Sequence, residues 1–245
     1  MLRRHNLQNL VIKAERNQDA RERKGLKNRV INSGESSVHF LPTPSKRKIV
    51  LKVFAPHAFN KKSSTSFQSQ LSAIAGSLNR LAKEFNKRAQ SYEKMIREEE
   101  SNPHTSFYPS PRTALSDHLK SREGIKNIAS VRIPKIIAEE EIAGGRYAVA
   151  MERILGPNFD ELLQASEGQY RKDVRGEFVK KFVKDHKIDP TKLRNQIAQI
   201  QEDITYTTRH WGSMSANPFI FRLDSFLVEG IDAKGNFKLV LVDLK

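Results

Sequence analysis

The sequence predicts an α+β fold, in which a long helix covers a mostly antiparallel sheet and a helical part carrying a small β-hairpin follows. Three observations lead to this prediction. Apolar residues recur at three- and four-residue steps across residues 66–100, which is typical of an amphipathic helix. Short β-branched and apolar runs bounded by Gly, Asn and Pro occur before and after that helix. Strands therefore come in groups separated by helices, instead of alternating with them one by one.

The first half of the chain is expected to hold three strands and the long helix. Residues 1–29 form a basic arm that is either helical or loosely ordered. Two short strands surround a small-residue turn within 30–41, and a stronger strand runs from Lys48 to Phe54. Residues 101–124 contain three prolines and are expected to form an inserted loop. The apolar stripe of the long helix consists of Leu71, Ile74, Leu78, Leu81, Phe85, Ala89, Tyr92 and Ile96.

The second half is expected to hold four strands and three helices. The turn Ala143-Gly144-Gly145 predicts a hairpin between its two flanking strands. A helix then begins at Pro157 or Asn158, and Thr191 is a plausible N-cap for a later helix. The expected strands are 131–142, 146–154, 226–231 and 237–242, and the two later helices are 169–187 and 191–211.

The composition limits the classes of partner and compartment. The chain carries 43 Lys and Arg against 28 Asp and Glu, which gives a net charge of +15. Such a charge favours nucleic acid, acidic proteins, anionic lipid or polyphosphate nucleotides as partners. There is no cysteine, which excludes disulfides and thiolate metal sites. The sequence has neither a run of about 18 apolar residues nor a secretory signal, so we expect no membrane span and a cytoplasmic protein.

Two motifs in the early strands resemble the protein-kinase-like fold. "SGESSVHF" places Gly34 and Val38 in and after a small-residue turn, and "IVLKVF" places Lys52 alone in an apolar run. The resemblance covers about residues 30–243. It implies that the Gly34 turn covers the nucleotide phosphates, that Val38 packs on the base and that Lys52 holds the α- and β-phosphates. A buried ammonium without a partner would be costly, so Lys52 should have a partner or ligand.

The resemblance also implies an adenine-reading segment and a carboxylate for Lys52. "YAVAMERILGPNFDELL" is similar to the fifth strand, hinge and following helix of kinases, with backbone groups of Met151, Glu152 and Ile154 at the hinge. The long helix should supply the carboxylate. Glu84 is the first candidate and Glu93 the second, and either could instead form surface i,i+4 ion pairs.

The closing hairpin, "FLVEGIDAKGNFKLVLVDLK", resembles the two kinase strands that end on the metal-binding acid. The resemblance implies that Asp243 coordinates Mg²⁺ bridging the phosphates of ATP. The glycine that ends the family's acid–aromatic–glycine triplet is absent.

The loop before the hairpin admits three registers. The first puts Ser225 at the metal-binding asparagine position and Ile220 at the base position. The second makes Asp224 the base and Glu229 a second metal ligand. The third puts Asn217 at the base position. The apolar pattern favours the first or third register, and Asp224 is still the best available acid for a base role.

In this interpretation, 1–29 is a basic N-terminal arm, 30–152 a nucleotide-binding small lobe and 153–245 a reduced helical lobe ending in the hairpin. The expected function is Mg-ATP binding and phosphate transfer to a protein hydroxyl, as in reduced or minimal bacterial effector kinases, which are delivered into a host cell. The alternatives are a pseudokinase scaffold with an acidic protein partner, or a basic nucleic-acid or ribonucleoprotein component. A full kinase continues beyond the metal aspartate, so we expect a truncated chain, one half of a split kinase or a minimised kinase.

Overall fold

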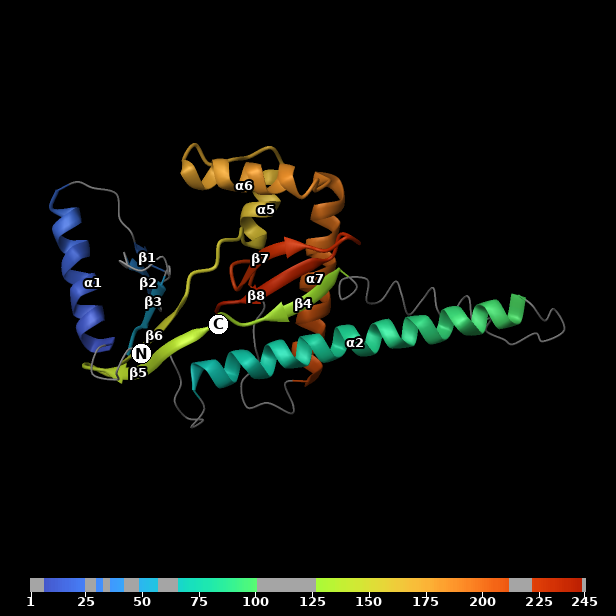
Figure 1. Ribbon diagram of the computed structural model, residues 1–245, viewed down its shortest axis with the longest axis horizontal. Coiled ribbons are helices and arrows are strands. Elements are labelled where there is room, and N and C mark those ends of the chain that lie inside the picture. The colour runs from blue at the N-terminus through green and yellow to red at the C-terminus, as the bar shows by residue number, and fades with distance from the viewer. Residues whose placement is uncertain are drawn as a thin grey trace. The chain divides into compact units, whose positions relative to one another are not determined.

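The computed structural model describes residues 7–24, 30–32, 36–41, 49–56, 66–100, 127–211 and 222–243 (Figure 1). It confirms a mixed α/β protein with an antiparallel sheet, and the described residues include five helices. The chain divides into two compact units. The first comprises Met1–Gln70 with Ile133–Ile154, and the second comprises Leu71–Arg132 with Leu155–Lys245. No helix among the described residues is both long and apolar enough to cross a membrane.

The first unit is built on a five-stranded antiparallel sheet with the order β1-β2-β3-β6-β5. The apolar runs found in the sequence form these strands, and the Gly144 and Gly145 turn joins β5 to β6 with positive φ at both glycines, as predicted. The strands are β1 (Val30–Asn32), β2 (Ser36–Leu41), β3 (Ile49–Phe54), β5 (Ile136–Ile142) and β6 (Arg146–Glu152). β3 is buried on both faces, because all its residues after Ile49 are buried.

Helix α1 (Leu7–Glu22) covers one face of this sheet. The N-terminal arm was expected to be either helical or loosely ordered, and it is helical over Leu7–Glu22. The core on this face consists of Leu7, Val11, Ala14, Leu51, Val53, Ile142, Ala148 and Ala150. Polar contacts close its edge, where the Arg146 guanidinium on β6 donates to the Glu15 carboxylate on α1.

His39 of β2 lies on the same face and is 6% exposed. Its Nε2 lies 3.0 Å from the Ser37 hydroxyl, while Nδ1 has no hydrogen-bond partner among the described residues. Burial lowers the pKa of His39 below its ordinary 6.5, the Glu15 carboxylate opposes that shift and Arg146 adds to it. Burial therefore favours the neutral form of the His39 imidazole.

Helix α2 (Phe67–Glu100) confirms the long helix expected at 66–100. Its first turn belongs to the first unit and is well capped. The Ser66 hydroxyl accepts the Ser69 N–H at 3.1 Å, and the Glu139 carboxylate of β5 accepts the Gln68 N–H at 3.2 Å. Helix N-termini leave N–H groups unsatisfied, and these two acceptors supply partners for them.

The second unit contains a three-stranded sheet, β4 (Ile128–Arg132), β8 (Phe237–Leu241) and β7 (Phe226–Ile231), in the order β4-β8-β7. β7 and β8 form the expected antiparallel hairpin, whereas β4 pairs with β8 in parallel. The single strand expected at 131–142 is therefore wrong. The run breaks between β4 and β5 around Pro134, whose nitrogen cannot donate to a ladder, and its two parts join different sheets.

The outer edge of β4 is closed by a side chain instead of a strand. Asn79 of α2 donates from Nδ2 to the Val131 carbonyl at 2.5 Å, and its Oδ1 accepts the Val131 N–H at 2.8 Å. The amide therefore reproduces both bonds of a ladder partner, and it protects an edge that would otherwise be open to another chain.

The second unit also contains three shorter helices, of which α5 contacts β7: α5 (Phe159–Ser166), α6 (Val174–Asp185) and α7 (Pro190–Trp211). Phe159 of α5 packs against Phe226 and Phe237 at centroid separations of 6.4 and 5.7 Å. The cap predicted at Thr191 is wrong, because the Asp189 carboxylate accepts the Thr191 N–H at 2.9 Å and α7 begins at Pro190. Proline is well suited to that first helical position, since its nitrogen needs no partner there.

Candidate functional site

Lys52 is the most deeply buried of the predicted nucleotide-contacting residues that the structure describes. It lies near the centre of β3 and is 3% exposed. Its ammonium lies 4.9 Å from the centroid of the Phe54 ring and 5.8 Å from that of Phe67, and the two rings are 5.3 Å apart. Aromatic faces attract a cation at such distances. Desolvation of an ammonium is costly, so this position demands anionic or polar compensation.

The sheet register places Val38 next to Lys52. The two residues are direct partners across β2 and β3, and Lys52 is in turn the partner of Val149 on β6. Partners across antiparallel strands project to the same face, so the three side chains form a row on the face opposite α1. The predicted phosphate-binding and base-packing residues thus lie side by side.

The same face carries a polar cluster at the first turn of α2. The Tyr147 hydroxyl donates to Glu139 and accepts a backbone hydrogen bond from Phe67. Burial, with the charge and hydrogen bond of Glu139, raises the pKa of Tyr147 to about 12. Glu139 also accepts the Gln68 N–H. Neither residue was singled out in the sequence, where "EEE" at 139–141 reads as a solvated run.

The predicted hinge lies at the end of β6, where the first unit ends at Ile154. Met151 is buried and is the partner of Val50. The Glu152 N–H donates to the Lys135 carbonyl at 3.0 Å, so it is already engaged within the protein. Ile154 lies two residues beyond the end of β6 and is partly buried.

Several predicted positions lie outside what the structure describes. Gly34 and Asn217 fall in segments that are not described, and the side chains of Glu84 and Glu93 on α2 are not described either. The predictions for these four residues therefore stay predictions.

Ser225 and Asp243 lie at the same end of the β7–β8 hairpin. The Val242 N–H donates to the Ser225 carbonyl at 2.9 Å, which continues the ladder one step beyond the Phe226–Leu241 pair. Ser225 is fully buried, and its hydroxyl has no partner among the described residues. Asp243 is also buried, with 9% of its surface exposed. A buried hydroxyl without a partner and a buried carboxylate are oxygen donors of the type that Mg²⁺ takes.

The other acids near the hairpin behave differently. Asp224 is exposed at the turn before β7, with its carboxylate 4.0 Å from the Arg222 guanidinium. Glu229, the alternative metal ligand, accepts a 2.9 Å hydrogen bond from Arg132, and this bond lowers the pKa of Glu229. In the described part of the chain, no cluster of three or more His, Asp or Glu side chains is arranged to hold a metal ion. A metal at Asp243 would therefore need ligands from Ser225, water and a bound phosphate.

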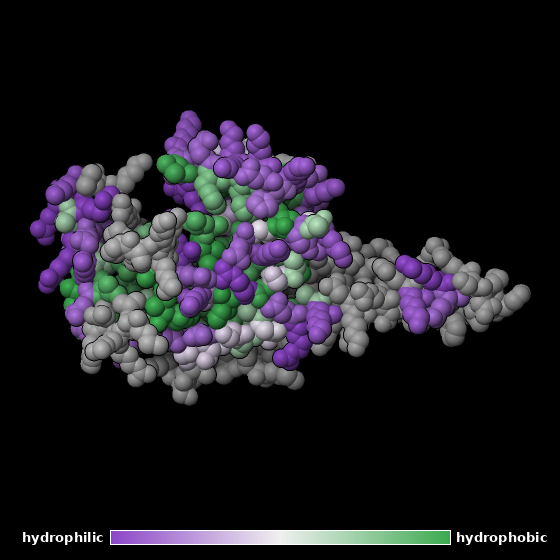
Figure 2. Space-filling view, in the orientation of Figure 1, coloured by the Kyte–Doolittle hydropathy of each residue, from purple (hydrophilic) through white to green (hydrophobic). Residues whose placement is uncertain are grey.

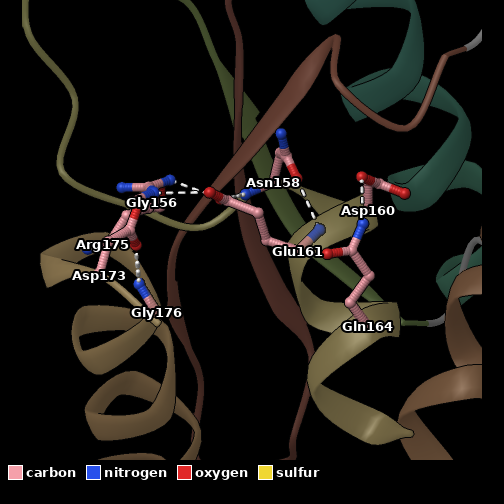
Figure 3. A network of polar contacts seen from close by, with 8 residues as sticks. All are labelled: Gly156, Asn158, Asp160, Glu161, Gln164, Asp173, Arg175 and Gly176. Atoms are coloured by element: carbon pink, nitrogen blue, oxygen red, sulfur yellow. Dashed lines mark hydrogen bonds and ion pairs between the residues drawn. The ribbon is translucent and has the colours of Figure 1, made fainter. Parts of the chain in front are cut away.

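The segment after the predicted hinge is held by a polar network (Figure 3). Arg175 donates to both oxygens of Glu161, and also to the Gly156 carbonyl at 2.8 Å. Asn158, one of the two residues expected at the start of α5, is its N-cap and forms a capping box with Glu161. Asp173 caps α6 through the Arg175 and Gly176 N–H groups. This network fixes the backbone at 156–158, with no reacting group in it.

Gly156 allows that backbone to lie against β7. The Val228 N–H donates to the Pro157 carbonyl at 2.8 Å, and Asn158 forms an isolated bridge with Leu227. A Cβ at position 156 would lie 2.2 Å from the Val228 carbonyl oxygen. The glycine is therefore required by a close backbone approach.

The surface of the second unit over α6 is strongly hydrophilic (Figure 2). Its exposed basic side chains include Lys180, Lys181, Lys184 and Lys187. Acidic residues are interspersed among them, and some pair locally, as Asp173 does with Arg171 at 2.9 Å. The surface is polar and carries an excess of positive charge.

The chain was compared with family models, curated proteins and solved structures. No family model matches the chain, and no curated protein matches it. The kinase domain of PknI from Mycobacterium tuberculosis, solved as a point mutant, is similar over 89% of this chain, at 12% identity and a TM-score of 0.29. The chain spans 58% of the length of that domain. At this identity and TM-score the likeness establishes neither a shared fold nor a shared activity.

Proposed function

We propose that this chain is a kinase-like protein that binds Mg-ATP and transfers its terminal phosphate to a protein hydroxyl. The observation that carries the proposal is the buried ammonium of Lys52 directly opposite Val38. A strand that buries a single lysine near its centre, beside an apolar side chain, suits a ligand with an anionic part and an aromatic part. A nucleotide has both.

Each unit is given its own role in this proposal. In the first, Lys52 holds phosphate oxygens and Val38 packs against the base, while backbone groups at Met151, Glu152 and Ile154 read its edge. Glu152 would contact the edge of the base through its backbone carbonyl, because its N–H already donates to the Lys135 carbonyl.

In the second unit, Asp243 and Ser225 supply oxygen ligands for Mg²⁺, which when bound neutralises phosphate charge. The buried, unpartnered hydroxyl of Ser225 supports this assignment. Asp224 is exposed and close to the hairpin end, so it can accept the proton of an incoming hydroxyl without burying a second charge.

Thermal unfolding with and without Mg-ATP tests the proposal. Ligand at one hundred times its dissociation constant should stabilise the protein by about 2.7 kcal/mol, which is about 5–10 °C in a chain of this size. Lys52→Met keeps the aliphatic stem over the aromatic rings and removes the charge, and Asp243→Asn removes the metal ligand. Both variants should lose the shift, while Lys94→Met and Asp185→Asn, exposed on α2 and α6, should keep it.

The transfer step needs its own experiment. Incubation with γ-labelled ATP and a mixture of protein substrates should label a protein hydroxyl, and Asp224→Asn should reduce the label without changing the thermal shift. Nucleotide binding without any transfer would instead support a pseudokinase scaffold. The Arg222 guanidinium, 4.0 Å from the Asp224 carboxylate, competes for the group that would act as the base, and this contact favours the pseudokinase candidate.

The excess positive charge supports a nucleic-acid-binding function as a further candidate. Binding of that kind should weaken steeply with salt and should not respond to Lys52→Met. Replacing Lys180 and Lys184 with Gln should weaken it instead. A filter-binding titration at 50 and 200 mM salt separates this outcome from magnesium-dependent nucleotide binding.

A further inference from the structure

His39 is a titratable side chain buried between the first sheet and helix α1. Its ladder partner on β3 is Leu51, which in turn pairs with Ala150 on β6. Leu51 and Ala150 both belong to the core under α1. Partners across antiparallel strands project to the same face, so the imidazole projects to the face that α1 covers. His39 is 6% exposed, which leaves it almost no contact with water.

The hydrogen bonds around the imidazole suit its neutral form. Nε2 lies 3.0 Å from the Ser37 hydroxyl, whereas the buried Nδ1 has no partner among the described residues. A neutral imidazole carries one N–H and a protonated imidazole carries two. Protonation would therefore leave a charged, buried donor without an acceptor in the described part of the chain, which is more costly than an unfilled acceptor.

The nearest charges compensate a proton on His39 only in part. The Glu15 carboxylate of α1 favours the protonated form, but it already accepts hydrogen bonding from the Arg146 guanidinium, whose charge opposes that form. The charged side chains on this face of the packed elements are Glu15 on α1, Arg146 and Glu152 on β6, and Glu140 on β5.

The other charged residues of these elements lie elsewhere. Lys52 of β3 projects to the opposite face, and β1 carries no charged residue. The remaining charged residues of α1 are Lys13, Arg16, Asp19, Arg21 and Glu22.

Helix α1 is the element whose departure would hydrate His39 at the lowest cost. It covers the sheet through the buried side chains of Leu7, Val11 and Ala14, and it takes no part in the strand ladders. Moving β2 would instead break its pairing with both β1 and β3. Local opening of α1 therefore requires less than loss of the sheet.

We infer that α1 is a pH-sensitive strap, which docks on the sheet while His39 is neutral and is released when His39 takes up a proton. The inference does not depend on the proposed nucleotide-binding function. Its direction follows from burial, which lowers the pKa of His39 in the docked state below 6.5. An imidazole that is exposed by release of α1 takes up a proton near pH 6.5, before the docked imidazole does. Below that pH, the ratio of released to docked α1 should rise by about tenfold per pH unit, until the docked imidazole is itself protonated.

Hydrogen exchange of the full chain, read by mass spectrometry from neutral pH to about pH 5 and corrected for the intrinsic rate at each pH, tests this inference. Protection of Leu7–Glu22 should fall by about tenfold per pH unit below 6.5, while protection of β3 and β6 should stay constant. His39→Gln and His39→Phe remove the titrating group, and each should make the protection of α1 independent of pH. His186→Gln, at an exposed histidine that follows α6 in the second unit, is the matched control and should behave like wild type.

Three results would overturn the inference. Protection of α1 in wild type that does not change with pH would show that no proton is linked to its docking. An equal loss of protection in α1, β3 and β6 would mean that acid unfolds the whole sheet instead of releasing the helix. A pH dependence of α1 that persists in either folded His39 variant would assign the effect to another group.

Discussion

Gly156→Ala should destabilise the second unit strongly, because the added methyl group meets backbone that has no room to move. The new Cβ would lie 2.2 Å from the Val228 carbonyl oxygen and 2.9 Å from its carbon. Both distances are below the separation that real Cβ atoms adopt. Moving the segment away would break the 2.8 Å bond from the Val228 N–H to the Pro157 carbonyl.

The size of the effect follows from these contacts. Overpacking costs typically about 1–3 kcal/mol, and two clashes with backbone place this change at about 3 kcal/mol, the upper end of that range. The melting temperature should then fall by about 6–12 °C in a chain of this length.

Gly76→Ala is the matched control in the same unit. A Cβ there meets nothing within 4 Å, and the glycine lies inside α2. Alanine should therefore raise the stability of the helix by about 1 kcal/mol. Circular dichroism melts of both variants make the comparison. Gly156→Ala melting within about 1 °C of wild type would refute the close approach of residues 156–158 to β7.

Three further predictions concern other contacts. Because the pKa of His39 is lowered in the folded protein, the unfolded chain binds the proton more readily, and the free energy of unfolding should fall as the pH drops below 6.5. Urea titrations at several pH values should show this fall in wild type and not in His39→Gln. Tyr147, with its pKa raised to about 12, should stabilise the fold below pH 10.0 and lose that contribution above it. Absorbance titration should show one late tyrosinate that Tyr147→Phe removes, and ionisation of every tyrosine near pH 10 would contradict this environment. Asn79→Leu leaves both Val131 backbone groups without their partner and should cost about 2 kcal/mol, read from the melting temperature; an unchanged value would mean that water replaces the amide fully.

Local patterns in the sequence predicted local structure well. The spacing of apolar residues predicted α2, and the observed N-cap of α5, Asn158, was one of the two residues expected at its start, because both signals depend on residues close in the chain. The cap predicted at Thr191 was wrong by two residues, because Asp189 accepts the Thr191 N–H and Pro190 occupies the first helical position.

Partnerships between distant strands could not be predicted in this way. Pro134 indicates a break in its run, but nothing nearby shows that β4 pairs in parallel with β8, about one hundred residues later in the chain. Glu139 was missed for the same reason. The position of Glu139 opposite Val149, on the same face of the sheet as Lys52, depends on the register of β5 with β6, including an irregularity between Ile136 and Ala138.

The pairing of Val38 with Lys52 could be predicted from the sequence, because the number of residues between the two strands of a hairpin sets which residues face each other. The buried, unpartnered hydroxyl of Ser225 was not, because its burial depends on how the second unit packs around the hairpin end.

Calorimetric titration of Mg-ATP into wild type and Lys52→Met tests the central claim most directly. The account predicts saturable, magnesium-dependent binding to wild type, at least tenfold weaker in Lys52→Met and unchanged in Lys94→Met. Absence of binding to wild type, or equal affinity in Lys52→Met, would contradict the assignment of Lys52 as a phosphate-holding residue.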